Sequence, residues 1–437
     1  MRAGRLRRLC STLTRAVSRD GALHCEWSDG SAGRFHHAWL RDHCPQSRHP
    51  VSGQRTFELR NLPPQLAPEK ISIGEGGRKL ALRWAAMDDS VEQHTSAYDA
   101  AWLRRACYDG ADDAPAAEAA AGGPPAVGSP ATPVPWSPAD LEGRVTAACT
   151  WRELQQPGRA GDAHALACLR ELRQRGFVLV SDTPPTEAAT AELAGTLGRL
   201  QGTFYGDGVW DTAPREEGDV IDTAYSNVEL PLHTDGCYLK HQPGLQLFVC
   251  AEQAALVAGR ELDGATKLAD GFAAADILRA HHPATYFYLC RVPIPFHHEE
   301  GEVCMEHVAP IFELDPSGSQ VASVRYNELD RAPFVPPHLS YEDVADFYEH
   351  ARILEQVLRS LEMPLRLRVG DALLIDNTRV LHGRHGFVGQ RNMIGCYMTS
   401  DDWLSRLRVL ERAATRETRT GASVCLSPRY VVGGVRP

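Results

Sequence analysis

Two short stretches, far apart in the chain, carry side chains that could bind a metal ion. The first holds His233 and Asp235, which are two positions apart, and the second holds His382. Side chains two positions apart on an extended segment point to the same side, so His233 and Asp235 could hold one face of a single ion. With His382 they would complete the two-histidine, one-carboxylate set that is characteristic of non-haem Fe(II) oxygenases, which keeps coordination positions open.

A guanidinium follows the second stretch, because Arg391 stands before an apolar run at residues 393–397. Oxygenases that decarboxylate 2-oxoglutarate need a forked cation to bind the far carboxylate of this cosubstrate. Arg391 is the predicted clamp, and Arg384 is the next candidate. A His-x-Asp pair alone is weak evidence, since chance produces it often and a solvated loop can carry it. The ordered set of motifs carries more weight.

The order of these motifs resembles that of the carnitine-pathway hydroxylases, the family of trimethyllysine dioxygenase and γ-butyrobetaine dioxygenase. The resemblance runs from about residue 20 to about residue 412, and the combination of segments is highly specific. The matching segments are WLRDHC at 39–44, DTAY at 222–225, LHTD at 232–235, DGF at 270–272, RYN at 325–327, DNTRVLHGR at 376–384 and GCYMT at 395–399.

The resemblance implies a role for each of these groups. Fe(II) would be bound by His233, Asp235 and His382, and 2-oxoglutarate by Arg391 and Thr266. Ascorbate is the expected reductant. The sequence around Thr266 departs from the usual glycine pair of the family, so an ordinary strand threonine is the alternative at that position.

Substrates of this family carry a trimethylammonium group, which has no N–H to donate and must be recognised by aromatic faces. Asp222 is expected to pair with the α-ammonium group of trimethyllysine, which γ-butyrobetaine lacks; the alternative is that Asp222 caps a turn or lies in solvent. An extra residue before Trp210 departs from the usual spacing. The expected substrate residues are Tyr205, Trp210, Asp222, Tyr225, Asn327 and Tyr397.

The activity implied is hydroxylation of N6,N6,N6-trimethyl-L-lysine at C3 with O2, a step of carnitine biosynthesis. The first alternative is a γ-butyrobetaine hydroxylase that forms L-carnitine. The second is a catalytically silent protein that binds trimethylammonium compounds.

The amino-acid composition of the chain limits which binding partners are expected. The chain is 43% hydrophobic and 23% charged, which is ordinary for a soluble globular enzyme. A net charge of -10 argues against nucleic acid or an anionic membrane as the main partner, and it fits a cationic substrate. The 12 cysteines are scattered, which indicates reduced thiols in an intracellular protein. The sequence leaves the oligomeric state open, a homodimer included.

The chain divides into segments of different composition. Residues 1–19 are rich in Arg, Ser and Thr without an acidic residue, which predicts a mitochondrial leader and a matrix location, with the cytoplasm as the alternative. A small N-terminal β domain is predicted at 20–108, a disordered linker rich in Ala, Pro and Gly at 109–135, the dioxygenase domain at 136–425 and a tail at 426–437.

In the family the N-terminal domain can carry a structural zinc. Cys44 and His94 align with ligand positions, and His49 could replace a cysteine. Gln46 stands where another thiolate is expected, and an amide is a poor zinc ligand. We therefore favour a metal-free N-terminal domain over a weakened zinc site.

Periodicity predicts a mixture of helices and strands, an α+β class. The resemblance adds the topology, a double-stranded β-helix (jelly roll) with helical buttresses. Helices are predicted at 98–107, 162–175, 186–200, 272–280, 341–361 and 402–413, and strands at 22–27, 33–35, 79–84, 177–180, 245–250, 286–292, 372–375 and 393–398.

Overall fold

The computed structural model describes residues 12–62, 65–84, 94–109, 132–204, 206, 208–213, 225–333 and 339–419. The chain forms two compact units, within residues 1–126 and 127–418, which are taken separately below. Within the described residues, no helix is both long and apolar enough to cross a membrane.

The first unit contains two antiparallel three-stranded sheets, in the orders β1-β2-β3 and β4-β5-β6. Its core is rich in aromatic residues, with Trp27, Phe35, Trp84 and Tyr98 all buried. The elements are β1 (Leu13–Arg19), β2 (Ala22–Trp27), β3 (Ala32–His36), α2 (His37–Asp42), β4 (Pro68–Gly74), β5 (Lys79–Trp84), β6 (Thr95–Asp99) and α3 (Ala100–Arg105).

Strand β1 overlaps the predicted leader. It pairs with β2 from Leu13 to Arg19, and Leu13 is buried in the core of this unit. Residues 13–19 of the predicted leader therefore lie in a strand of the first unit. Two arginines of this stretch, Arg15 and Arg19, are solvent-facing charges of an edge strand, where charged side chains are common; Arg15, for example, pairs with Glu26. Residues 1–11 lie outside the described part of the chain.

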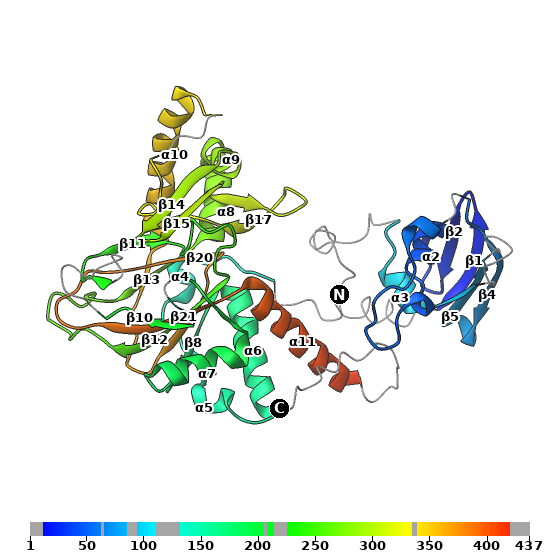
Figure 1. Ribbon diagram of the computed structural model, residues 1–437, viewed down its shortest axis with the longest axis horizontal. Coiled ribbons are helices and arrows are strands. Elements are labelled where there is room, and N and C mark those ends of the chain that lie inside the picture. Colours follow the sequence, from blue (N-terminus) through cyan, green and yellow to red (C-terminus); the bar gives the residue numbers. More distant parts are fainter. Residues whose placement is uncertain are drawn as a thin grey trace. The chain divides into compact units, whose positions relative to one another are not determined.

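The second unit is built on two sheets (Figure 1). The larger has the order β10-β21-β12-β19-β8-β7, with β9 beside β21, and every pairing is antiparallel except that of β7 with β8. Its strands are β7 (Ala147–Thr150), β8 (Phe177–Ser181), β9 (Leu200–Gln201), β10 (Val209–Asp211), β12 (Leu245–Glu252), β19 (Ala372–Asp376) and β21 (Asn392–Met398).

The smaller sheet has the order β11-β20-β13-β18. Leu268 and Val380 from this sheet pack with Leu373 and Met393 from the larger one, so the two sheets enclose a common core. This is the jelly-roll type of sandwich that was expected. The strands are β11 (Leu230–His233), β13 (Thr266–Asp270), β18 (Met363–Leu365) and β20 (Val380–Arg384).

Helices cover the outer faces of the sandwich (Figure 1). Leu169, Leu193 and Trp403 bring α6, α7 and α11 onto the larger sheet. Leu278 and Leu358 belong to a second core, which covers the smaller sheet with α8, α9 and α10. The helices are α4 (Pro138–Leu141), α5 (Trp151–Leu154), α6 (Arg159–Arg175), α7 (Glu187–Leu197), α8 (Gly271–His281), α9 (Pro283–Arg291), α10 (Tyr341–Ser360) and α11 (Ser400–Arg419). Two hairpins lie between α9 and α10, formed by β14 (Ile294–Glu300) with β15 (Val303–Ala309) and by β16 (Phe312–Leu314) with β17 (Val321–Val324).

One predicted strand is wrong, because residues 286–292 lie mostly in helix α9. Pro283 occupies the first turn of this helix, where a missing N–H has no cost. Tyr286 and Leu289 are three residues apart and both are buried, as one face of a helix requires. The aromatic residues of the segment suggested a strand, but contact of that face with the neighbouring helices and strands decides its structure.

Candidate metal centre and substrate cavity

The pairing of two strands brings the metal-binding residues together. His233 ends β11 and stands directly opposite His382 of β20. Asp235 lies just beyond β11, in a turn. Its Oδ1 is 3.2 Å from His233 Nε2 and 3.6 Å from His382 Nε2. Ligand atoms of all three residues lie within 4.8 Å of one another, so one ion could contact all of them.

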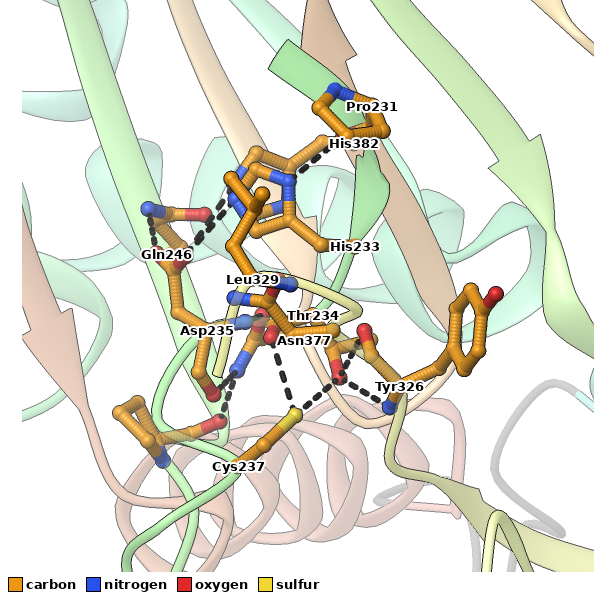
Figure 2. Close-up of polar contacts among 12 residues, drawn as sticks. Pro231, His233, Thr234, Asp235, Cys237, Gln246, Tyr326, Leu329, Asn377 and His382 are labelled. Atoms are coloured by element: carbon orange, nitrogen blue, oxygen red, sulfur yellow. Dashed lines mark hydrogen bonds and ion pairs between the residues drawn. The ribbon is translucent and has the colours of Figure 1, made fainter. Parts of the chain in front are cut away.

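An asparagine fixes the backbone of Asp235. The Asp235 N–H donates to Asn377 Oδ1 at 2.8 Å, and Asn377 Nδ2 donates to the carbonyl oxygens of Asp235 at 3.1 Å and Pro243 at 2.8 Å. Asn377 has no exposed surface. Figure 2 shows its amide beside the turn that carries Asp235. The turn, rather than strand alternation alone, therefore directs this carboxylate toward the two histidines.

A hydrogen bond orients His233, and burial keeps His382 neutral. His233 Nδ1 is 2.8 Å from the carbonyl oxygen of Pro231, to which it can donate, and this leaves Nε2 as the ligand atom. Burial, opposed by Asp235 and reinforced by His233, lowers the pKa of His382 to about 4. His382 is therefore neutral at neutral pH, as a metal ligand must be.

Charge and hydrogen bonds keep Asp235 ionised. Burial would raise the pKa of this carboxyl group, but His382, His233 and the Tyr397 hydroxyl together hold it well below its usual range. Tyr397 Oη donates to Asp235 Oδ2 at 2.8 Å, and Gln246 Nε2 donates to the same oxygen. With Oδ2 engaged in this way, Oδ1 is the oxygen that faces both histidines.

A cavity of about 280 Å³ opens at the three residues. Its wall combines aromatic rings with a few polar groups, which is typical of small-molecule sites. The residues that line it are Trp210, Thr212, Tyr225, Leu230, His233, Asp235, Gly236, Tyr238, Gln246, Phe248, Thr266, His298, Asn327, Leu329, Asp330, His382, Gly383, Arg384, Arg391, Met393 and Tyr397.

Arg391 and Thr266 are neighbours in the cavity wall. Arg391 is buried; its Nε donates to the Gly264 carbonyl oxygen at 2.9 Å and its Nη2 to Thr266 Oγ1 at 3.4 Å. Burial and the nearby Arg384 lower the pKa of Arg391 to about 9. Within the described residues, no carboxylate lies within salt-bridge distance of Arg391, so a bound anion would relieve an unfavourable buried charge.

Three of the expected aromatic residues reach the same cavity. The rings of Trp210 and Tyr397 are 5.2 Å apart at their centroids, and Tyr225 is buried in the wall. Gly395 makes room for the indole, because a Cβ there would lie 2.5 Å from the Trp210 ring. The cavity wall also includes Asn327. Tyr205 and Asp222 lie outside the described residues.

Several residues of the site were not predicted. Gln246 lies opposite Tyr397 across β12 and β21, and an isolated glutamine in an apolar strand was the available signal. Asn377 was visible only as part of a matching segment. Tyr238 and His298 were missed because they lie in a turn and in a hairpin whose folding onto the cavity has no local signature.

In the first unit, two of the three expected zinc ligands are close together. Cys44 Sγ is 3.1 Å from His94 Nε2 and 3.3 Å from Gln46 Oε1. Gln46 Oε1 also accepts from the Ala97 N–H at 2.8 Å. His49 Nδ1 instead accepts from the Ser52 N–H. Among the His, Cys, Asp and Glu residues described, only His233, Asp235 and His382 form a group of three with metal-binding spacing.

Comparison with known proteins gives matches to both units. Residues 143–397 match the model of the taurine catabolism dioxygenase TauD, TfdA family. Residues 14–104 match the gamma-butyrobetaine hydroxylase-like, N-terminal family.

Individual relatives span most of the chain. A trimethyllysine dioxygenase of Meyerozyma guilliermondii is 31% identical, over 90% of this chain and 95% of that protein. A gamma-butyrobetaine dioxygenase of a Pseudomonas species is also 31% identical, over 92% of this chain and 97% of that protein. The mitochondrial trimethyllysine dioxygenase of Bos taurus is 28% identical, over 89% of this chain and 88% of that protein.

Proposed function

Because the chain belongs to the family of the trimethyllysine and gamma-butyrobetaine dioxygenases, within the TauD/TfdA dioxygenases, we propose that it hydroxylates N6,N6,N6-trimethyl-L-lysine at C3 with Fe(II), 2-oxoglutarate and O2. The observation that carries this proposal is one cavity that holds three kinds of group. These are a His-Asp-His set, a buried arginine without an acidic partner in the described residues, and a cluster of aromatic rings.

The donor set fits Fe(II). His233 Nε2, His382 Nε2 and Asp235 Oδ1 would hold the ion, which supplies the O2-dependent oxidation of a C–H bond when bound. Pro231 orients His233 through its carbonyl oxygen. Tyr397 and Gln246 orient the carboxylate of Asp235 through Oδ2. Mutation of such hydrogen-bond partners of metal ligands typically costs about 10- to 100-fold in metal affinity or activity.

Arg391 is suited to the distal carboxylate of 2-oxoglutarate. Two of its N–H groups are used by Gly264 and Thr266, which fix the plane of the guanidinium. The lowered pKa of about 9 reflects the cost of burying the cation without an anion. A carboxylate bound in a forked arrangement would offset that cost.

The aromatic residues are suited to a quaternary ammonium group. Trp210, Tyr225 and Tyr397 line the cavity beside the metal-binding residues. Their faces attract a cation without any need for an N–H donor, and burial strengthens the attraction. A trimethylammonium substrate bound there would extend toward the iron, with the carbon to be hydroxylated next to His233 and His382.

Of the two alternatives, only the first has specific support. A γ-butyrobetaine hydroxylase is favoured by the relative of that name, which is as similar as the trimethyllysine enzyme of Meyerozyma guilliermondii. A silent binding protein would need only the aromatic cluster. The oriented His-Asp-His set argues against it, because binding alone gives no reason for that arrangement.

One assay separates the three. The protein is incubated with Fe(II), ascorbate, 2-oxoglutarate and either trimethyllysine or γ-butyrobetaine, and succinate and hydroxylated product are measured, with His382→Ala as the control. Faster turnover of trimethyllysine is the expected result. Preference for γ-butyrobetaine would establish the first alternative. If neither compound gives a product, the silent binding protein is the remaining alternative.

A mitochondrial matrix location accompanies this proposal, with the cytoplasm as the alternative. Relatives in cattle, rat and human are named mitochondrial. Cell fractionation of the full chain, with and without residues 1–11, tests it, and a purely cytoplasmic full-length protein would exclude it.

A further inference from the structure

Two cysteine thiols face each other in the core of the second unit, outside the cavity wall. Cys149 of β7 and Cys168 of α6 have their Sγ atoms 3.1 Å apart, within hydrogen-bond distance. Both residues are buried, with 7% and 1% of their surface exposed. Neither lines the cavity, and neither has a part in the proposed binding of metal, 2-oxoglutarate or substrate. The proposed function therefore leaves this pair of nucleophilic groups unexplained.

Regular elements of secondary structure bring the two thiols together. β7 lies at the edge of the larger sheet, where Cys149 pairs in parallel with Val180 of β8. Cys168 lies on the face of α6 that carries Ala165 and Leu172, both of which are buried. All five residues belong to one hydrophobic core. The contact between the thiols thus joins an edge strand to the helix that packs beside it.

A capping box fixes the chain next to Cys149. The Thr150 N–H donates to Glu153 Oε2 at 2.7 Å, and the Glu153 N–H donates to Thr150 Oγ1 at 3.3 Å. These bonds begin α5 directly after β7 and satisfy backbone N–H groups that the helix itself leaves free. Cys149 is therefore held from both sides, by the pairing of β7 and by the first turn of α5.

The contact between two thiols distinguishes this pair from other buried cysteines of the second unit. Cys237 and Cys250 donate to carbonyl oxygens of nearby residues, at 3.3 Å and 3.8 Å. Among the described cysteines, Cys149 and Cys168 are the two whose thiols are hydrogen-bond partners of each other. Formation of an S–S bond between them requires only a small movement of two side chains on fixed elements.

The two thiols differ in acidity and in exposure. The hydrogen bond from Cys168 lowers the pKa of Cys149, against the effects of burial and of Glu153. The pKa of Cys168 is raised by Cys149 and by burial. The thiolate is the nucleophilic form of cysteine, and Cys149 is also the more exposed of the two. Cys149 is therefore the thiol that should react first with a small oxidant.

We propose that Cys149 and Cys168 are a site of reversible oxidation, at which a hydroperoxide converts the two thiols into a disulfide between β7 and α6. The inference goes beyond the proposed hydroxylase function and is independent of it, because it requires neither the metal nor the cavity. The two residues are 19 positions apart, and closing this loop restricts the unfolded chain. The oxidised protein should therefore be more stable than the reduced protein.

The reaction balances with one hydrogen peroxide molecule per pair. The Cys149 thiolate attacks one peroxide oxygen, the O–O bond breaks, and the hydroxide that leaves takes up the Cys149 proton to give water. Cys149 is then a sulfenic acid, which condenses with a thiol to a disulfide. In that step the Cys168 sulfur attacks the Cys149 sulfur, the S–O bond breaks, and hydroxide leaves with the Cys168 proton as the second water. Each sulfur gives up one electron, and the peroxide is reduced by two.

Peptide mapping of the oxidised protein tests the proposal. The full-length chain is reduced, freed of reductant and treated with an equimolar amount of hydrogen peroxide while free iron is chelated, and the remaining thiols are alkylated. The expected product is a pair of peptides joined through Cys149 and Cys168, which dithiothreitol separates. Closure of the loop should raise the unfolding temperature by roughly 5 °C or more relative to the reduced protein.

Serine variants and an exposed cysteine supply the controls. Cys149→Ser and Cys168→Ser should each give no such cross-link and no rise in unfolding temperature on oxidation. Cys304→Ser, at an exposed cysteine of β15, retains the pair and should cross-link as the wild type does. The wild-type peptide map is decisive by itself if a serine variant fails to fold. Unmodified Cys149 and Cys168 beside an oxidised Cys304, sulfinic or sulfonic acids without a cross-link, or a disulfide between other cysteines instead would overturn the proposal.

Discussion

Both carboxylate oxygens of Asp235 have partners. One oxygen faces His233 and His382, and the other accepts from Tyr397 and Gln246. Tyr397 also belongs to the aromatic group expected to bind the substrate. A single phenol thus connects the substrate end of the cavity to the metal-binding end.

Removing a metal-binding side chain should abolish iron binding without unfolding the chain. His233→Ala, Asp235→Ala and His382→Ala each leave two ligands, and the described residues offer no replacement within the group. Fe(II) titration followed by fluorescence, with circular dichroism to verify the fold, measures this. Turnover at the wild-type rate in any of the three would refute the assignment.

Tyr397→Phe should separate the two roles of that residue. The ring is retained, so substrate binding should change little, but the 2.8 Å hydrogen bond to Asp235 Oδ2 is lost. Loss of such a partner typically lowers metal affinity or activity about 10- to 100-fold. Fe(II) affinity and the KM for trimethyllysine are the measurements, and Tyr341→Phe, at an exposed site, is the control. A large rise in KM with unchanged iron affinity would contradict the expectation.

Arg391→Ala should weaken 2-oxoglutarate binding far more than substrate binding. Breaking one side of a buried ion pair typically costs about 3–5 kcal/mol, which is at least about a hundred-fold in affinity. The dissociation constants of both ligands, measured side by side, decide the matter. Equal losses would exclude Arg391 as the clamp, and Arg384, which also lines the cavity, would then be tested.

At the scale of elements, a buried ion pair fixes the strand that carries His382. Arg379, one residue before β20, is 1% exposed and donates through Nη2 to Asp270 at 2.7 Å, at the end of β13. The same guanidinium donates to the carbonyl oxygens of Gln174, at the end of α6, and Val134. The pair therefore joins the smaller sheet to a helix of the larger one.

Arg379→Met should lower the free energy of unfolding by about 3–5 kcal/mol, because it leaves Asp270 buried without its partner. Denaturant unfolding measures the change. The control is Arg279→Met, which breaks an exposed pair with Asp276 and should cost at most about 1 kcal/mol. Similar losses in the two variants would show that the buried pair does not stabilise the sandwich.

The sequence predicted elements that depend on local interactions better than elements that depend on contacts between residues far apart in the chain. Helix α6 ends where Gly176 adopts φ 80°, a local signal that was visible in advance. Strand β1 was not predicted, and helix α9 was predicted as a strand, because sheet pairing and packing, which act over long separations, decide them. The same limit applies in the site. His233, Asp235 and His382 were recognisable as a motif, whereas Gln246 and His298 acquire their places only when the strands and hairpins fold onto the cavity.

At the scale of the whole molecule, the two units differ in how they depend on metal. The second unit presents ligands that face a common point. In the first unit, Cys44 is satisfied by neighbours, since its Sγ lies 3.3 Å from Gln46 Oε1 and 3.1 Å from His94 Nε2. Gln46 in turn accepts from the Ala97 N–H on β6, so its amide serves as a structural link in place of a thiolate.

The first unit should therefore fold with little or no zinc. Burial and the nearby Arg41 lower the pKa of His94, which keeps this imidazole neutral and able to serve as the hydrogen-bond partner of Cys44. Elemental analysis of protein purified without added metal should find much less than one zinc per chain, and Cys44→Ser should unfold at nearly the wild-type temperature, because a hydroxyl can replace the thiol in both contacts. Cys25→Ser, at a buried site in the core of the same unit, is the contrasting control and should destabilise it. One tightly bound zinc per chain that is lost in Cys44→Ser would show that Cys44, His94 and a further ligand hold a structural metal after all.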